Sequence, residues 1–148
     1  MSVARSLFAR GLHLIDDAQH RIYGDRKTHL LSGLTGTVVE VGPGTGLNLA
    51  YLNRNVTYIG LEPNRHLHTS IRARMRAHGI EGEVRADPIE ASGLPAQSAD
   101  AVISTLVLCS VSDMKAALAA IRRLLRPGGQ LVFIEHIAAE EQSWSRTL

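Results

Sequence analysis

"VVEVGPGTGLN", residues 38–48, is the stretch that decides how the rest of the sequence is interpreted. The β-branched valines around Glu40 predict a buried strand. Gly42, Gly44 and Gly46 follow at alternate positions, which predicts a turn where a ligand can approach the backbone closely. A plain tight turn is the alternative, but three spaced glycines exceed what such a turn needs. The stretch therefore predicts a strand, then a ligand-binding loop, then a helix.

Strand and helix patterns alternate along the chain after this stretch. Further strands are expected in "VTYIGL" (56–61), "EGEVRAD" (81–87), "SADAVISTLVL" (98–108) and "QLVFIEH" (130–136), with helices at 47–52, 64–79 and 112–125. Strands that are nearly all apolar are typical of a parallel sheet buried on both faces. We therefore predict an α/β fold with a doubly wound parallel sheet, whose ligand crevice lies at the carboxyl ends of the strands.

The N-terminal segment, residues 1–32, is predicted to be helical. Apolar side chains recur there at helical spacing, at Leu7, Phe8, Leu12, Ile15, Ala18 and Ile22. Charges in every turn exclude a signal peptide, and no run of the sequence is apolar for long enough to cross a bilayer. We expect this segment to form a lid or cap on a ligand-binding domain of residues 33–148.

Composition narrows the range of partners. A length of 148 residues suffices for one domain with its own core. The 16 basic and 14 acidic residues give a net charge of +2, which makes no case for nucleic-acid binding. The single cysteine, Cys109, excludes an internal disulfide and a paired-cysteine zinc site. We expect a cytoplasmic protein that acts on a small molecule without a metal; stable membrane insertion is not expected, although peripheral contact stays open.

The residues around the glycines narrow the choice of ligand. A P-loop would need a Lys-Ser or Lys-Thr pair where Leu47 and Asn48 stand. The dinucleotide pattern G-x-G-x-x-G is also broken, because Gly46 comes one position early and Leu47 occupies the place of the last glycine. An NAD-dependent oxidoreductase is therefore a disfavoured alternative. The carboxylate of Glu40, just before the loop, suits a ligand with a cationic group.

Two more carboxylates follow predicted strands. Glu62 lies roughly twenty residues after the first glycine, which is the expected distance for an acid that binds the ribose hydroxyls. Its alternative role is an exposed acid at a helix N-terminus. Asp87 ends the third strand and could accept a hydrogen bond from an adenine amine, or it could simply initiate a turn before Pro88. A cationic group, a ribose and an adenine occur together in S-adenosylmethionine (SAM).

At this point the sequence resembles the class I SAM-dependent methyltransferases, in the type 11 small-molecule group that includes the ubiquinone and menaquinone methyltransferases. "VVEVGPGTG" resembles the first motif of that family, "YIGLEPN" the acidic second motif, "SADAVISTLVLCSV" the fourth-strand motif and "LLRPGGQLVFIEH" the segment before and in strand five. The resemblance covers about residues 37–136. "TLVLCSV" and "RPGGQLVFIEHIAAEEQSW" look closest to the animal methyltransferase-like proteins that methylate small thiols.

The resemblance implies a Rossmann-like sheet with strand order 3-2-1-4-5 and a set of cofactor-binding residues. Glu40 and the glycine loop would hold the methionine end of SAM, Glu62 the ribose and Asp87 the adenine, whereas Asn48 has no assigned role. The full set is Glu40, Gly42, Pro43, Gly44, Thr45, Gly46, Asn48, Glu62, Pro63, Asn64, Asp87, Pro88, Thr105 and Leu106. The product would be S-adenosylhomocysteine.

Two further residues are weighed for catalysis. His136 follows strand five, on the acceptor side of such a fold, and could take a proton from the acceptor or merely cap the strand end. Cys109 could be a nucleophile, but a small buried residue is the favoured interpretation. We expect in-line methyl transfer to a small, apolar acceptor, which could be a thiol, a quinol or phenol, or a lipid. A SAM-binding module without catalysis is the alternative.

The region after strand five departs from the family pattern. Members of the family continue with a further helix and an antiparallel strand pair, roughly fifty residues in a domain of ordinary size, whereas this sequence stops at Leu148. We therefore expect that pair to be missing. Truncation, completion of the fold by another chain, and loss of activity are the alternatives. An exposed edge at strand five would favour a homo-oligomer.

Overall fold

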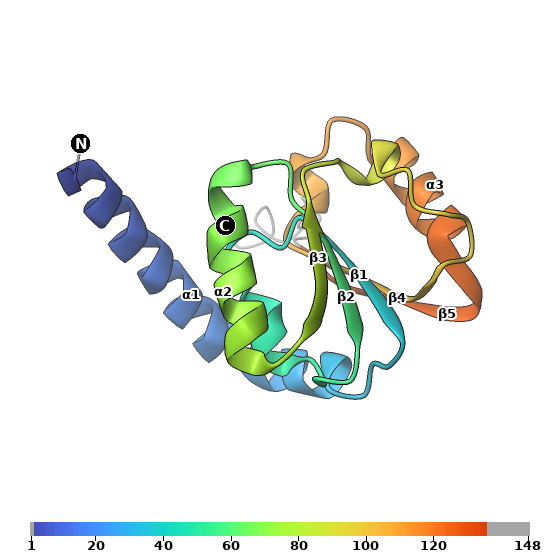
Figure 1. Cartoon of the computed structure of the whole chain (residues 1–148), viewed down its shortest axis with the longest axis horizontal. Coiled ribbons are helices and arrows are strands. Elements are labelled where there is room, and N and C mark those ends of the chain that lie inside the picture. Colours follow the sequence, from blue (N-terminus) through green and yellow to red (C-terminus); the bar gives the residue numbers. More distant parts are fainter. Residues whose placement is uncertain (1, 136–148) are drawn as a thin grey trace, which may run out of the picture.

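A five-stranded parallel sheet with helices on both faces organises the protein (Figure 1). The computed structural model describes residues 2–135. With η denoting a 3-10 helix, the elements are α1 (Ser2–Leu31), β1 (Thr37–Val41), η1 (Leu47–Tyr51), β2 (Thr57–Leu61), η2 (Arg65–Leu67), α2 (His68–His78), β3 (Glu81–Arg85), η3 (Ile89–Ala91), β4 (Ala99–Thr105), η4 (Leu108–Ser110), α3 (Met114–Leu124) and β5 (Leu125–Ile134).

The strands are ordered β3-β2-β1-β4-β5, which confirms the predicted doubly wound sheet and its 3-2-1-4-5 order. Val39 of β1 lies opposite Ile59 of β2 on one side and opposite Val102 of β4 on the other. The strand order reverses between β1 and β4, and a doubly wound sheet opens its ligand crevice at the carboxyl ends of the strands flanking that point. The loops after β1, β2 and β4 are therefore expected to form the ligand-binding site.

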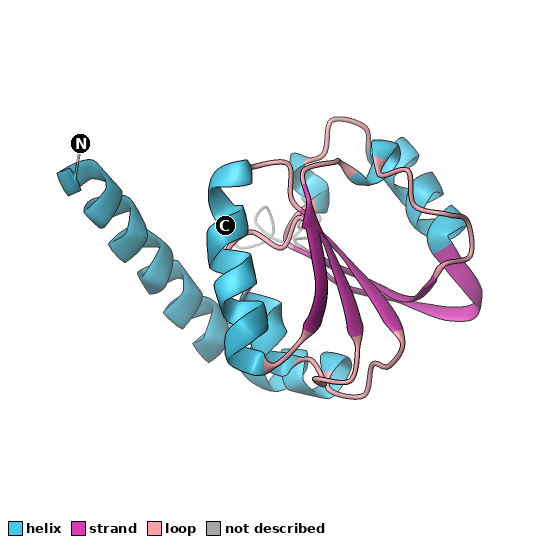
Figure 2. Cartoon of the chain, viewed as in Figure 1, coloured by secondary structure: helices cyan, strands magenta, loops and turns pink. Residues whose placement is uncertain are grey.

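The two faces of the sheet are covered by different helices (Figure 2). On one face Val38 and Tyr58 pack into a core that includes Leu31 of α1, Leu49 of η1 and Ile71 of α2. The other face packs β1 and β4 against α3 and η3, with Val39, Val41, Val102, Ile89 and Ile121 in its core. Successive residues of β1 thus enter opposite cores, which explains why apolar residues occupy positions on both faces of this strand.

Local capping follows the sequence closely. The side chain of Asn64 accepts a hydrogen bond from the His66 N–H, and the side chain of Asp113 accepts one from the Ala116 N–H. Gly79 follows the last residue of α2 in the left-handed conformation, at the predicted end of this helix. The N-terminal helix runs from Ser2 to Leu31, as expected for residues 1–32. Other elements differ from the expectation: the helix at 47–52 is a 3-10 helix, the helix at 64–79 is divided into η2 and α2, and β5 begins at Leu125 rather than at residue 130.

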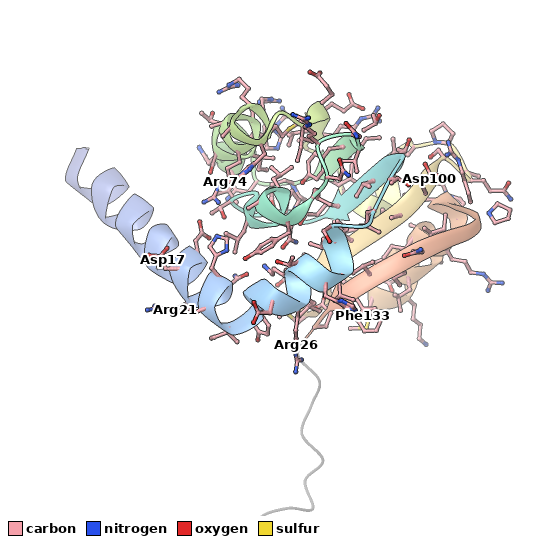
Figure 3. All side chains as sticks on the ribbon, turned by 90° about the horizontal axis from the view of Figure 1, so that it is seen from below. Asp17, Arg21, Arg26, Arg74, Asp100 and Phe133 are labelled. Atoms are coloured by element: carbon pink, nitrogen blue, oxygen red, sulfur yellow. The ribbon has the colours of Figure 1, made fainter. Side chains whose placement is uncertain are left out.

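Helix α1 has two unlike halves. Its N-terminal half extends away from the sheet (Figure 1), whereas its C-terminal half packs beside η1 and delivers the buried Leu31 to the core. Arg21 and Arg26 point from α1 into the open space away from the sheet (Figure 3). No helix within residues 2–135 has the length and apolar character needed to cross a membrane.

Strand β5 forms one edge of the sheet. Within the described part of the chain it pairs with β4 only, in a register that shifts between Ala99 and Ala101. The side chain of Phe133 on this strand is 60% exposed. The homo-oligomer expected through this edge stays a prediction, as does the expected lack of a C-terminal antiparallel strand pair, since residues 136–148 are outside the described range.

Candidate functional site

Two cavities share Gly42, which lies at the carboxyl end of β1, as a lining residue. The first, which we call the apolar cavity, has a volume of about 420 Å³ and is lined mainly by Val41, Leu61, Pro63, Pro88, Ile89, Val107 and Val111, with Glu62 and Asn64 among its polar members. The second, which we call the charged cavity, measures about 220 Å³ and is lined by Asp16, Gln19, Lys27, Glu40, Asn48 and Thr105 together with the glycine loop and Leu106. Together they form one bipartite site.

The glycine loop owes its shape to backbone conformation and to close packing. Gly42 has a φ of 58°, and a Cβ added there would lie 2.3 Å from a methyl carbon of Val107. Gly44 has a φ of 59°, but a Cβ there would meet nothing within 4 Å. The first glycine is therefore required by packing and conformation together, whereas Gly44 is required by conformation alone and leaves space beside the charged cavity, which it lines.

Glu62 fastens the glycine loop to the loop after β2. One carboxylate oxygen accepts from the Gly44 N–H at 3.0 Å and the other accepts from the Asn64 N–H at 2.9 Å. Glu62 is buried but lines the apolar cavity. It is not the acid at a helix N-terminus considered as its alternative role, because Asn64 occupies that position. Each carboxylate oxygen keeps a further lone pair, so the group has capacity for two ligand hydroxyls.

Glu40 is a carboxylate held below the glycine loop. Only 1% of the residue is exposed, and its oxygens accept hydrogen bonds from Asn48 Nδ2 at 2.6 Å and from the Tyr58 hydroxyl at 2.5 Å. Burial raises the pKa of Glu40, although these two hydrogen bonds and the positive charge of Lys27 oppose the rise. A carboxylate in such surroundings gains most from a cation that binds beside it.

Asn48, which lines the same cavity, carries a buried acceptor without a partner. Its Nδ2 donates to Glu40 and to Thr105 Oγ1, the latter at 3.0 Å, but its buried Oδ1 has no hydrogen-bond partner among the side chains of residues 16–135 and the backbone that the structure describes. Leaving a buried acceptor unpaired costs about 1–3 kcal/mol, so such an atom needs an explanation. A ligand N–H beside Glu40 supplies one, and a cationic amine fits both groups. These two acceptors thus fit the ammonium group at the amino-acid end of SAM.

The apolar cavity lacks one residue that the sequence favoured. Pro88 and Ile89 line it, as do Pro63 and Asn64, but Asp87 does not, and the side chain of Asp87 is exposed. An apolar lining of this kind suits an adenine ring. The role of Asp87 at the adenine stays a prediction, and its exposed position places it at most on the rim.

Three residues of α1 that the sequence did not single out line the charged cavity, namely Asp16, Gln19 and Lys27. Asp16 accepts from Thr45 Oγ1 at 3.0 Å and pairs with Arg74 of α2 at 2.6 Å. The available signal was spacing: Asp16 and Lys27 are eleven residues apart, close to three helical turns, so both lie on one face of α1.

Glu135, directly after β5, was also missed. One of its oxygens accepts from Ser104 Oγ at 2.7 Å and from the N–H groups of Val107 and Leu108 at 3.2 Å. It thereby holds the loop in which Leu106 has a φ of 55°, a conformation that costs free energy for a residue with a side chain. The signal available was a carboxylate at the end of a predicted parallel strand, on the crevice edge.

Two candidates for catalysis fare differently. The interpretation of Cys109 as a buried small residue is wrong: it lies in η4, on the loop that leaves β4, and is exposed. His136 lies outside the described residues, so its role stays a prediction. Among the side chains that the structure describes, those of residues 16–135, no group of His, Cys, Asp or Glu is arranged to hold a metal ion.

The sheet order and the two cavities are those expected of a SAM-dependent methyltransferase, and a family comparison shows this class. Residues 39–133 match the model of the family described as "Methyltransferase domain", so the chain belongs to the class I SAM-dependent methyltransferases. The chain is similar to the thiol S-methyltransferase TMT1B of Homo sapiens, with 34% identity over 97% of this chain and 63% of that protein. It thus spans less than two thirds of that relative.

Solved structures share the fold. The YcgJ protein of Bacillus subtilis superposes with a TM-score of 0.71 at 19% identity, over 82% of this chain and 53% of that one. The geranyl diphosphate C-methyltransferase of Streptomyces coelicolor, solved with Mg²⁺, geranyl diphosphate and S-adenosylhomocysteine, gives a TM-score of 0.68 at 19% identity over 78% and 46% of the two chains. At such identities the likeness establishes the architecture.

Proposed function

We propose that this chain binds SAM across the two cavities and transfers its methyl group to a small acceptor, with a thiol as the favoured class. The amino-acid end of SAM would occupy the charged cavity and the adenosine the apolar cavity. The observation that carries this assignment is the unpaired Oδ1 of Asn48 beside the buried carboxylate of Glu40. A bound ammonium would satisfy the first and neutralise the second.

The remaining contacts follow from the groups that line each cavity. Glu62 would accept hydrogen bonds from the ribose hydroxyls while still holding Gly44 and Asn64. Pro88 and Ile89 would enclose the adenine. Gly42, which lines both cavities, would lie along the middle of the cofactor, where the absence of a side chain lets the ligand pass close to the backbone.

Methyl transfer requires the protein mainly to align the methyl donor with the acceptor. Bound SAM would supply a methyl group that is already activated by its positive sulfur. The protein then has to orient donor and acceptor in line and exclude water. Glu135 would act in this step as a positioning residue, since it fixes the loop after β4 through Ser104, Val107 and Leu108. His136 remains our candidate for accepting a proton from the acceptor.

A thiol acceptor is supported by two arguments. The first is the similarity to a protein named as a thiol S-methyltransferase, at 34% identity. The second is chemical: a thiol has a pKa of about 8.5, so part of it is already the nucleophilic thiolate near neutral pH and needs no strong base. Quinols, phenols and lipids are the other acceptor classes that a small methyltransferase of this type would serve.

Calorimetry tests the cofactor assignment first. Titration with SAM, S-adenosylhomocysteine and NAD should give saturable heat for the first two and none for NAD. Binding of NAD without SAM would overturn the proposal in favour of a nucleotide-dependent oxidoreductase.

A transfer assay with methyl-labelled SAM then tests the reaction. Small thiols, phenols, quinols and dispersed lipids are offered in parallel, and label should move to the thiols. Transfer to another class alone would contradict the thiol assignment. SAM binding with no transfer to any of the four would favour a SAM-binding module without catalysis.

A further inference from the structure

Lys27 is a buried cation in the wall of the charged cavity. Only 1% of the residue is exposed, although it lies on α1, whose neighbouring residues Arg26 and Thr28 are both exposed. Its ammonium donates to Gln19 Oε1 at 3.2 Å and lies 5.8 Å from the centre of the Tyr51 ring. The side chain therefore points inward, beneath the glycine loop, rather than into solvent as lysines usually do.

The carboxylates near Lys27 are already engaged by other groups. Asp16 pairs with Arg74 and accepts from Thr45, while Glu40 accepts from Asn48 and Tyr58. Within residues 2–135 no salt bridge joins Lys27 to either of them. An ammonium group has three donors, and the Gln19 amide occupies one. Burial lowers the pKa of Lys27, and the nearby charges of Glu40 and Asp16 oppose this only in part. A ligand carboxylate that binds the ammonium group would therefore stabilise its charged form.

The charged cavity carries groups complementary to both charges of an amino acid, the positive ammonium and the negative carboxylate. Glu40 and the unpaired Asn48 Oδ1 are acceptors for an ammonium group, and Lys27 is a donor for a carboxylate. Resting on the SAM-binding function proposed above, we propose that Lys27 binds the carboxylate of the SAM amino-acid end and so makes the site selective for donors that carry this carboxylate. In this arrangement α1 supplies one of the cofactor contacts directly.

The experiment compares S-adenosylhomocysteine with its decarboxylated analogue, which keeps the amine and the adenosine. We expect the wild-type protein to bind the decarboxylated compound about 10–100-fold more weakly, the loss typical of a charged hydrogen bond. In Lys27→Met the affinity for the carboxylate-bearing ligand should fall by about the same factor, and the affinity for the analogue should stay unchanged. The variant would then no longer distinguish the two ligands.

A matched control is available, because Lys115 on α3 is the second lysine of the sequence and is exposed. Lys115→Met should keep both affinities and the full discrimination. Lys27→Arg should keep a preference for the carboxylate, because the cation remains. Thermal melting shows whether each variant is folded, and Lys27→Gln replaces the methionine variant if that one is not.

Three results would overturn the inference. Wild-type protein that binds both ligands equally well has no carboxylate contact to assign. Equal weakening of both ligands in Lys27→Met would mean that Lys27 acts through Glu40 or through packing. Unchanged affinities in that variant would remove Lys27 from the site. Failure of wild-type protein to bind SAM or S-adenosylhomocysteine at all is a different result, because it contradicts the proposed function itself.

Discussion

The charged cavity and the apolar cavity share Gly42, but they would bind a ligand through different interactions, ionic in the first and apolar in the second. Asp16, Lys27 and Glu40 make the first a place of buried ionisable groups. The second is walled by aliphatic and proline side chains, with Glu62 as its buried carboxylate. A buried charge that lacks its partner costs free energy, so the charged cavity should bind ligands that miss one ionic group much more weakly. The free energy gained by apolar burial is proportional to the buried area, so the apolar cavity should contribute affinity and tolerate small changes in the ligand.

The largest effect is expected from Glu40→Gln. The substitution keeps the size of the side chain but removes the charge that faces the ligand ammonium, so SAM binding should weaken by about 2–4 kcal/mol in calorimetry. Methylthioadenosine, which lacks the amino-acid end, should bind the variant as it binds wild-type protein. Glu83→Gln, at an exposed strand residue paired with Arg85, is the matched control and should leave both affinities intact.

If Glu40→Gln weakened methylthioadenosine as much as SAM, the two cavities would not be separable. The comparison would then fail, since a change confined to the charged cavity would have disturbed the apolar one.

Glu62→Ala is expected to cost less and to act on both ligands. It removes the acceptor of the ribose hydroxyls, and SAM binding should weaken by about 1–3 kcal/mol. Because the ribose is common to both compounds, methylthioadenosine should lose affinity by a similar amount. Glu81→Ala, an exposed residue of β3, serves as the control. Unchanged affinity for either ligand would remove Glu62 from the site.

The stability of the protein should also reflect the burial of Glu40. Its pKa is raised in the folded protein from an ordinary value of 4.5, chiefly by burial. Between that value and the raised pKa the folded state holds more protons than the unfolded state, so this residue makes the free energy of unfolding fall as pH rises. Glu40→Gln resembles the protonated form and should be more stable than wild type at pH 8, with the difference becoming smaller as the pH falls.

Denaturant unfolding at pH 5 and pH 8 measures this difference. A variant less stable than wild type at pH 8 would show the opposite sign, and would mean that Glu40 stabilises the fold as a counter-charge to Lys27 more than its own burial costs.

The sequence predicted the parts of the site that lie on one continuous strand–loop–helix unit or directly after a strand. Glu40, the glycine loop and Glu62 could be found because the carboxyl ends of neighbouring parallel strands share one edge of the sheet. Lys27 and Asp16 could not, because the contact between α1 and that edge is tertiary. A lysine on an amphipathic helix is normally solvated, and its own neighbours in the sequence gave no sign of burial.

Other predictions failed because the residues lie on loops. Cys109 was interpreted as buried because cysteine usually is, whereas η4 presents it to solvent. The place of Glu135 at the end of a predicted strand put it on the crevice edge, but its hydrogen-bond partners could not be predicted. Its three hydrogen bonds depend on a loop after β4 whose left-handed Leu106 no local pattern predicts. Strand order and caps are determined locally or by chain topology, but loop conformations depend on contacts between distant segments.

The smallest effect is expected from Asp87→Ala, and it tests the adenine end of the comparison. If the apolar cavity holds adenine by burial against Pro88 and Ile89, an exposed carboxylate outside its wall adds little, and SAM binding should change by less than about 0.5 kcal/mol. Ile89→Ala, which removes buried wall area, should instead weaken SAM and methylthioadenosine alike. A loss of more than about 1 kcal/mol in Asp87→Ala, the value of a hydrogen bond, would mean that the loop after β3 closes on the adenine and that the sequence-based role of Asp87 is correct.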